Sequence, residues 1–207
     1  MITIVNYGMG NLGSMLNMFK RIGVKASIAS DPAVIRQTDK LVLPGVGAFD
    51  AAMNRINSTE GLRDVLHQKA LVDRIPILGV CLGMQLLTRG SEEGKESGLG
   101  WIAADTLRFP RIDGLKVPHM GWNISRPTVR SGLFKNINID PCYYFVHSYY
   151  FSQVREDNVI TYTDYGFDFP SVVCNPAKNV IGVQFHPEKS QKQGLRILEN
   201  FSRFTNA

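Results

Sequence analysis

The amino-acid sequence predicts an α/β fold: a single-domain, open and mostly parallel sheet with flanking helices and an added β-rich segment. The first supporting observation is that short β-branched runs alternate with amphipathic stretches up to residue 87. Second, this alternation then stops, and the next part of the chain is rich in aromatic and β-branched residues. Third, a length of 207 residues suffices to bury the core of one domain, which we expect to cover residues 1–207.

The first part of the chain divides into strands and helices by its hydrophobic pattern. Residues 2–5 form a β-branched run that predicts a strand, and residues 12–22 predict a helix because their apolar side chains recur at helical spacing. The apolar run over residues 76–80 is long enough for one buried strand. Strands are also predicted over residues 25–29 and 40–43, and helices over 32–37, from 48 onward and within 59–73. In such a sheet, reactive groups lie at the carboxyl ends of the strands.

The second part of the chain is predicted to be mainly β-structure, and it follows a polar, glycine-rich loop over residues 90–100. Turns are expected at Asp113-Gly114, Asp140-Pro141 and Tyr165-Gly166. Candidate strands cover residues 101–102, 107–109, 143–151, 159–163, 171–173 and 180–183. The last predicted element is an amphipathic helix over residues 191–204, which we expect to pack on the sheet.

Composition and charge exclude several classes of protein. No apolar run approaches the roughly 18 residues of a membrane span, and the first residues lack the basic segment of a signal peptide. The net charge of +5 comes without a dense run of Lys and Arg, which argues against nucleic-acid binding. Three scattered cysteines fit a reducing compartment, and no metal-ligand spacing exists. Gly8, Gly10 and Gly13 do not match the dinucleotide motif G-x-G-x-x-G. We therefore expect a cytoplasmic protein that uses neither metal nor cofactor.

Cys81 stands between the predicted strand over residues 76–80 and a predicted helix over residues 82–87. Gly79 and Gly83 flank it, and small residues at a strand-to-helix junction are typical of a nucleophile elbow. The partial positive charge at the start of the helix favours the thiolate form of the cysteine. A buried structural cysteine is the alternative interpretation. A base elsewhere in the chain is needed to decide for a nucleophile.

His186 is the strongest candidate for that base. Pro187 favours an extended conformation of His186, and extended side chains two residues apart project to the same side. His186 and Glu188 can therefore face one cleft. A carboxylate next to an imidazole fixes its tautomer and stabilises its cation, which leaves the second ring nitrogen for a thiol. With Cys81, these side chains form the minimum set for acyl transfer from an amide.

His119 and His147 compete with His186 for the role of base. Each has an aromatic context with a nearby glycine or serine that could border a cleft. Neither is followed by a carboxylate as His186 is.

The motifs, taken together, resemble a known family of enzymes. Residues 79–85 (Gly-Val-Cys-Leu-Gly-Met-Gln) and 185–188 (Phe-His-Pro-Glu) are similar to the class I, triad-type glutamine amidotransferases. Residues 44–47 (Pro-Gly-Val-Gly), 118–123 (Pro-His-Met-Gly-Trp-Asn) and 186–190 (His-Pro-Glu-Lys-Ser) resemble, more narrowly, the glutaminase subunits of imidazole glycerol phosphate synthases. The resemblance covers essentially the whole chain.

The resemblance implies that residues 1–207 form one glutamine amidotransferase domain. It implies that glutamine is hydrolysed to glutamate and ammonia through a γ-glutamyl thioester on Cys81. His186 then serves as base and acid, and Glu188 orients it. The implied contacts to glutamine are Gln85, Glu93, Ser148 and Tyr149.

The resemblance also implies a partner. Ammonia would pass to a (β/α)₈-barrel synthase subunit, with which the chain forms a heterodimer and which makes imidazole glycerol phosphate in histidine biosynthesis. The implied interface contains Asn11, Trp122, Tyr143 or its neighbour Tyr144, and Lys189.

An oxyanion on the thioester pathway needs two backbone N–H donors. One is expected from Leu82, directly after the nucleophile. The second is expected from the turn formed by Gly45, Val46 and Gly47, because its glycines permit unusual peptide orientations. We hypothesise that this peptide rotates inward when the partner binds its ligand. Lys189 follows Glu188 directly, so an interface ion pair there would connect docking to the reactive group.

Three alternatives remain from the sequence. The same glutaminase chemistry could supply a synthase-like partner that aminates a nucleotide sugar for a surface polysaccharide. A stand-alone cysteine hydrolase is a second alternative, and Gln85 and the segment 118–123 argue against it. A non-catalytic binding subunit is the third, and the presence of Cys81, His186 and Glu188 argues against it.

Overall fold

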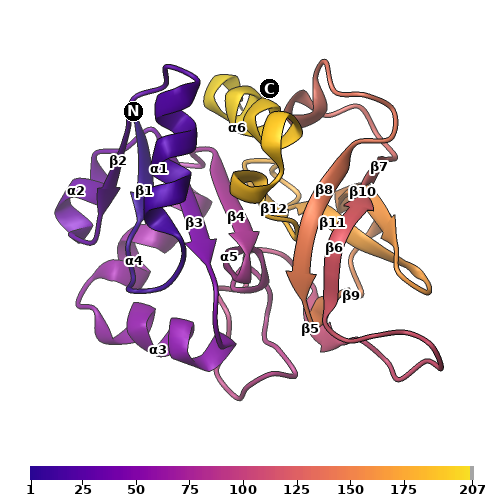
Figure 1. Cartoon of the computed structure of the whole chain (residues 1–207). Coiled ribbons are helices and arrows are strands. Elements are labelled where there is room, and N and C mark those ends of the chain that lie inside the picture. Colours follow the sequence, from indigo (N-terminus) through magenta and orange to yellow (C-terminus); the bar gives the residue numbers. More distant parts are fainter. Residues whose placement is uncertain (206–207) are drawn as a thin grey trace.

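The computed structural model describes residues 1–205, and its centre is an eight-stranded sheet in the order β2-β1-β3-β4-β12-β11-β10-β7 (Figure 1). Adjacent strands from β2 to β12 are parallel, and the remaining pairs are antiparallel. In sheet order the strands are Ala26–Ala29, Ile2–Val5, Lys40–Gly45, Ile77–Cys81, Val180–Val183, Asp168–Cys174, Val159–Asp164 and Arg126–Pro127. The predicted open, mostly parallel sheet is confirmed. The prediction of one domain extends to residues 206 and 207, which lie outside the described residues.

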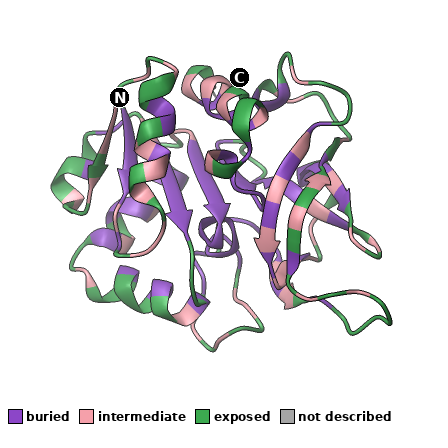
Figure 2. Cartoon of the chain, in the orientation of Figure 1, coloured by how far each residue is buried: buried purple, intermediate pink, exposed green. Residues whose placement is uncertain are grey.

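Helices cover both faces of the sheet because successive residues of each strand point to opposite sides. Leu41 and Leu43 of β3 face one core, which α3 and α4 complete, while Val42 faces the other core with α1 and α6. The α-helices are α1 (Leu12–Arg21), α2 (Pro32–Arg36), α3 (Phe49–Ser58), α4 (Leu62–His67), α5 (Leu82–Gln85) and α6 (Gln191–Arg203). A π-helical turn (Gln68–Val72) continues α4, and 3₁₀ turns cover Gly132–Phe134, Glu156–Asn158 and Pro187–Lys189. The central strands are buried, and the outer faces of the helices are exposed (Figure 2).

Two small antiparallel sheets form the added β-rich segment. β5 (Asp105–Arg108) pairs with β9 (Tyr149–Ser152), and β6 (His119–Ile124) pairs with β8 (Cys142–His147). The single strand predicted over residues 143–151 is therefore two strands, which separate at Ser148 and join different sheets. This separation matters for function because Ser148 forms a corner between the two sheets.

Several predicted elements differ from the observed ones. Trp101 and Ile102 are buried but not in a strand, because Gly100 turns with a φ of +69° and Ile102 N–H donates to the carbonyl of Leu87. The helix predicted over residues 82–87 ends at Gln85. β6 and β7 were not predicted. In β6 the apolar residues alternate along the strand, but their side faces outward and His119 points inward, so the usual relation of the apolar side to the core is reversed.

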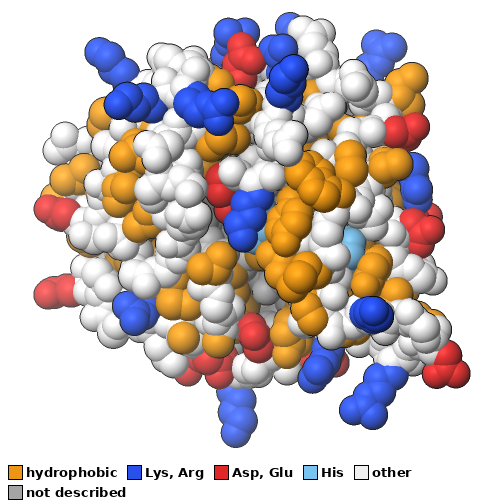
Figure 3. Space-filling view, in the orientation of Figure 1, with side chains coloured by type: hydrophobic (Ala, Val, Ile, Leu, Met, Phe, Trp, Pro, Cys, Tyr) orange, Lys and Arg blue, Asp and Glu red, His pale blue; other side chains and the backbone are white. Residues whose placement is uncertain are grey.

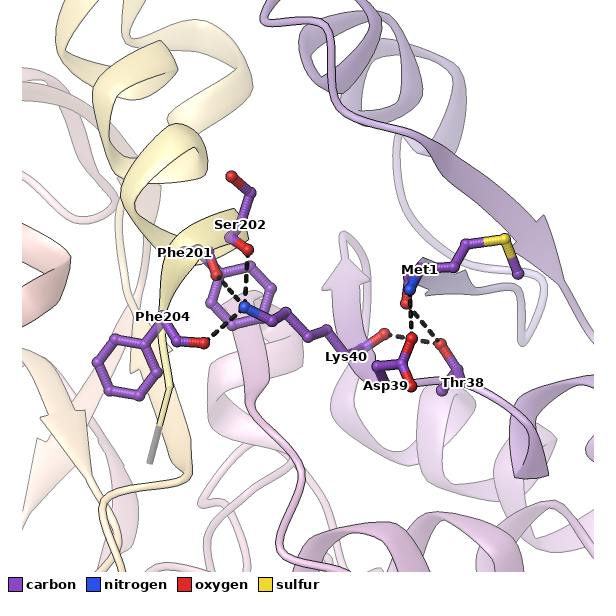
Figure 4. Close-up of polar contacts among 7 residues, drawn as sticks. All are labelled: Met1, Thr38, Asp39, Lys40, Phe201, Ser202 and Phe204. Carbon is purple, nitrogen blue, oxygen red and sulfur yellow. Dashed lines mark hydrogen bonds and ion pairs between the residues drawn. The ribbon is translucent and has the colours of Figure 1, made fainter. Parts of the chain in front are cut away.

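The end of α6 is tied to the start of β3 by one lysine (Figure 4). Lys40 Nζ donates to the carbonyl oxygens of Phe201 at 3.3 Å, Ser202 at 2.7 Å and Phe204 at 2.5 Å. The last carbonyls of a helix have no partner within the helix, and a lysine side chain can satisfy them. The adjacent Asp39 pairs with the amino terminus of Met1. This anchor fixes the helix that directly follows His186 and Glu188.

Within residues 1–205, no helix is both long and apolar enough to cross a membrane.

Candidate active site

Cys81 ends β4 in a strained backbone conformation, with φ 52° and ψ −110°. A positive φ is uncommon for a residue other than glycine and is often found at functional sites. The turn is also packed closely against β3, because a Cβ atom on Gly83 would lie 1.7 Å from the carbonyl oxygen of Leu43. Only glycine fits at position 83 in this arrangement. Cys81 therefore lies in the sharp strand-to-helix turn that the flanking glycines predict.

The strand register brings three distant segments to the end of β4. Gly45 of β3 is the pairing partner of Cys81, and Val183 of β12 is the partner of Val80. The segment 45–47 thus lies on one side of Cys81, and residues 184–188 follow on the other side. This is the carboxyl edge of the parallel strands, where the sequence places the reactive groups.

His186 and Glu188 form a buried pair next to Cys81. His186 Nδ1 and Glu188 Oε1 are 2.8 Å apart, and the two side chains are only 1% and 5% exposed. The loop is held in place because His186 N–H donates to the carbonyl of Tyr144. Ser190 Oγ donates to the carbonyl of His186 at 2.6 Å and accepts from Tyr144 N–H at 3.0 Å. Nδ1 of His186 is therefore committed to the carboxylate, and Nε2 is the nitrogen left for chemistry.

The surroundings of His186 favour its cation. Burial by itself lowers the pKa of His186, but hydrogen bonding and charge interaction with the sulfur of Cys81, in its thiolate form, and with the carboxylate of Glu188 outweigh it and raise that pKa to about 10. A raised pKa means that the folded protein binds this proton more tightly than the unfolded chain does. The resulting stabilisation is complete below the ordinary value of 6.5 and is lost as the pH rises through about 10. An imidazolium beside a thiolate is the pair needed for nucleophilic attack.

A cavity of about 270 Å³ opens over Cys81. Its volume is near the lower end of small-molecule sites, roughly 300–1,000 Å³, which fits an amino-acid-sized ligand. It is lined by Val46, Gly47, Cys81, Leu82, Gln85, Glu93, Val146, His147, Ser148, Tyr149 and His186. Within residues 1–205, no three His, Cys, Asp or Glu side chains are grouped as metal ligands would be.

The cavity brings together the residues predicted to contact glutamine. Gln85, Glu93, Ser148 and Tyr149 all line it. Gln85 is buried, and its Nε2 lies 3.5 Å from the carbonyl of Tyr149, which it can donate to. Glu93 accepts a hydrogen bond from the first N–H of α3, on Phe49, at 2.9 Å.

The predicted oxyanion donors also lie at the cavity. Val46, Gly47 and Leu82 line it, and Gly45 lies beside Cys81 in the sheet. Gly47 has a φ of +112°, a conformation that side chains rarely allow.

Gln184 was missed by the sequence reasoning. This fully buried side chain donates from Nε2 to Cys81 Sγ at 3.7 Å, and its Oε1 accepts from Gln85 Nε2 at 3.3 Å. Cys81 Sγ lies 3.8 Å from the carbonyl oxygen of Val146, to which the thiol form can donate. Gln184 precedes His186 by two residues, the same spacing that separates His186 from Glu188. In an extended segment this spacing places side chains on one side, and it was the sequence signal that could have indicated Gln184.

The residues predicted at a partner interface are placed differently from one another. Asn11 and Lys189 are exposed, and Trp122 is 50% exposed. Tyr143 is fully buried and stacks on Phe185 with ring centres 3.9 Å apart, so its predicted place at an interface is wrong. Residues of β8 alternate between core and surface, which puts the neighbouring Tyr144 on the outside. Lys189 Nζ lies 5.6 Å from the centre of the Tyr144 ring.

Replacing Glu188 by glutamine is expected to lower the pKa of His186 from about 10, because the amide cannot stabilise the imidazolium by charge. An NMR titration of the His186 ring nitrogens measures this shift. Glu199→Gln is the matched control, since Glu199 pairs with Arg196 and Arg203 on the surface of α6. An unchanged titration in Glu188→Gln would show that the carboxylate does not act on the imidazole.

Comparison with known proteins identifies the family. Residues 3–203 match the model of the class-I glutamine amidotransferases. The chain is 47% identical over 201 residues to the imidazole glycerol phosphate synthase subunit HisH 2 of Pseudomonas aeruginosa, covering 97% of this chain and 98% of the relative. It is 48% identical over 202 residues to the subunit HisH of Archaeoglobus fulgidus, covering 97% of each.

Solved structures share the fold. A crystal structure of a glutamine amidotransferase has a TM-score of 0.75 at 18% identity and covers 97% of both chains. A chain of PurLQS from Thermotoga maritima has a TM-score of 0.72 at 16% identity, covering 98% of this chain and 97% of the other. Since the family match spans nearly every described residue and two relatives share almost half of its sequence, this chain belongs to the class-I glutamine amidotransferases.

Proposed function

We propose that this chain is the glutaminase subunit of an imidazole glycerol phosphate synthase. The observation that carries the proposal is the group formed by Cys81, His186 and Glu188 at one cavity. The names of relatives that match almost the whole chain support the assignment to histidine biosynthesis.

The geometry supports a two-step hydrolysis. The Cys81 thiolate attacks the γ-carboxamide carbon of glutamine, and a C–S bond forms. His186 gives its Nε2 proton to the departing nitrogen, the C–N bond breaks and ammonia leaves. Water then attacks the thioester, His186 takes a proton from it, and the thiolate leaves as glutamate is released. Glu188 keeps Nδ1 of His186 protonated and oriented throughout.

The oxyanion formed in each step is stabilised by backbone donors. Leu82 N–H is one of them, because Leu82 begins the helix behind the nucleophile. The segment Gly45, Val46 and Gly47 supplies the second. Val46 is 45% exposed and Gly47 is also exposed, so the peptide between them is the part of this segment that is free to rotate, whereas Gly45 is closely packed against Tyr7 and Leu82. If this peptide rotates only when the partner has bound its acceptor substrate, glutamine is not hydrolysed in the absence of an acceptor for the ammonia.

The exposed face of β6 fits a protein partner. Met120, Trp122 and Ile124 are 62%, 50% and 37% exposed and occupy alternate positions on one side of the strand. Hydrophobic side chains gather over β6 and β8 in the space-filling view (Figure 3). We assign this face, together with Asn11, Tyr144 and Lys189, to a (β/α)₈-barrel synthase subunit. The two chains form a cytoplasmic heterodimer in this proposal.

The test combines the chain with its barrel synthase and measures glutamate formation. Glutamine hydrolysis is expected to rise strongly when the phosphoribosyl acceptor of histidine biosynthesis is added to the complex. Equal rates for the isolated chain and the loaded complex would reject the gating. Absence of glutaminase activity in the loaded complex would reject the function.

The same experiment separates the surface-polysaccharide alternative. Stimulation by a nucleotide sugar with its own synthase, and none by the phosphoribosyl acceptor, would support that alternative. The names of the two relatives described above do not favour it.

A further inference from the structure

His119 and His147 are not used by the chemistry above, yet they are directly connected to the cavity. They lie opposite each other in the pairing of β6 with β8 and are 2% and 5% exposed. His119 Nδ1 and His147 Nε2 are 3.0 Å apart. His147 lines the cavity, and His119 lies behind it.

Both imidazoles are neutral in this environment. His119 is stacked between the rings of Phe145 and Tyr165, with ring centres at 4.8 Å and 4.0 Å. Burial lowers the pKa of His119 to about 4, and burial is also the main reason why the pKa of His147 falls to about 3. Neither ring carries a charge near neutral pH.

The hydrogen-bond partners of the two histidines determine which ring nitrogens donate and which accept. His147 Nδ1 lies 2.7 Å from the carbonyl oxygen of Tyr149, which can only accept, so Nδ1 carries the proton. A neutral His147 then has a bare Nε2, which accepts from His119 Nδ1–H. The bare Nε2 of His119 accepts in turn from Asn123 Nδ2 at 3.2 Å.

Asn123 fixes the outer end of this chain. Its Nδ2 also donates to the carbonyl of Asp164 at 2.8 Å, and its Oδ1 accepts from the N–H of Ile124 at 2.8 Å. These two contacts allow only one orientation of the amide. Every donor in the chain therefore meets an acceptor.

The inner end of the chain is the wall that faces the ligand. The carbonyl of Tyr149 accepts from His147 and lies 3.5 Å from Gln85 Nε2, while the carbonyl of Ser148 accepts from the N–H of Phe109 at 3.0 Å. Ser148 is the point where the chain passes from β8 to β9. The bond from His147 to the residue two positions later closes this corner.

We propose that His147, supported by His119, is a positioning residue that holds the Ser148–Tyr149 corner in the conformation that binds glutamine. The proposal deepens and rests on the proposed function, since it takes this corner as part of the glutamine site. The side chain of Asn123 shares the inner side of β6 with His119, opposite to Trp122, so the chain of hydrogen bonds runs along the inner side of β6 from Asn123 to the cavity. The histidines act through the corner and not on the reacting atoms.

The experiment uses three variants in the complex with the barrel synthase. His147→Phe keeps an aromatic ring among Phe109, Phe145 and Phe169 but removes both hydrogen bonds. His147→Asn retains an N–H that can reach the Tyr149 carbonyl. His119→Phe removes the donor to His147 and the acceptor for Asn123, and it leaves the bond from His147 to Tyr149 in place. We expect KM for glutamine to rise about tenfold or more in His147→Phe and about threefold in His119→Phe, with kcat changed little. His147→Asn should recover most of the loss.

A spectroscopic measurement on the unmodified chain tests the same proposal without any substitution. The ¹⁵N NMR signals are expected to show both rings neutral and protonated at Nδ1 at pH 7. A charged ring or an Nε2–H tautomer of His147 would overturn the proposal. An unchanged KM in His147→Phe would also overturn it. The same holds if His147→Phe lowers kcat and stability and raises KM together, and His147→Asn does not restore them. Inactivity of the unmodified complex would instead reject the proposed function and leave the tautomer test standing.

Discussion

Replacing Cys81 by alanine is expected to lower kcat/KM for glutamine in the loaded complex by about 10⁴-fold or more. Without the thiolate no thioester can form, and the oxyanion donors and His186 alone leave only a small residual rate. The fold should survive, because alanine lacks only the sulfur atom and the side chain at this position contacts the cavity. Glutamate formation at saturating acceptor measures the effect.

Cys142 provides the matched control for this substitution. It is a free cysteine on β8 and does not line the cavity. Cys142→Ala should therefore retain the activity of the unmodified chain. If Cys81→Ala kept activity within about tenfold of that value, covalent catalysis by Cys81 would be ruled out.

The largest expected effect on stability comes from Gly83→Ala. The new Cβ would lie 1.7 Å from the oxygen and 2.7 Å from the carbon of the Leu43 carbonyl, and both atoms belong to the backbone of β3. Neither atom can move without separating α5 from the sheet. We expect the free energy of unfolding to fall by about 3 kcal/mol or more, a large part of the roughly 5–15 kcal/mol of a typical domain.

Gly13→Ala is the matched control, because Gly13 is likewise the second residue of a helix, α1, and has open space around its Cα. There alanine should stabilise by about 0.5–1 kcal/mol, since it reduces the freedom of the unfolded chain. Urea denaturation of both variants gives the comparison. A similar free energy of unfolding for the two variants would contradict the close packing at Gly83.

The first part of the fold was predictable because its signals are local. The β-branched run over residues 2–5 and the amphipathic pattern of α1 each contain enough information to define an element. β6 has an apolar pattern of period two, but a glycine and an asparagine separate its apolar residues, which cover an exposed face that we assign to a partner. Tyr143 and Tyr144 look alike in sequence, and only the register of β8 decides which one is buried.

The site was predictable where the residues that define its chemistry are close together in the sequence. Cys81 has its glycines beside it, and His186 has its carboxylate two positions away. The contact of Gln184 with Cys81 depends on β12 lying next to β4, and the contact of His119 with His147 depends on the pairing of β6 with β8. Those contacts join residues far apart in the chain, so a local pattern can place Gln184 on the same side as His186 but cannot reveal the contacts themselves.

The strained backbone at Cys81 is a cost that stability alone would not favour. A conformation of this kind costs about 1–3 kcal/mol in a residue with a side chain, and glycine would adopt it at little cost. Glycine at position 81 would therefore relieve this backbone cost, but it would remove the nucleophile and the packing of its buried side chain. The backbone cost at Cys81 is thus tied to the predicted nucleophile, because the same sharp turn that creates the cost holds the sulfur at the cavity.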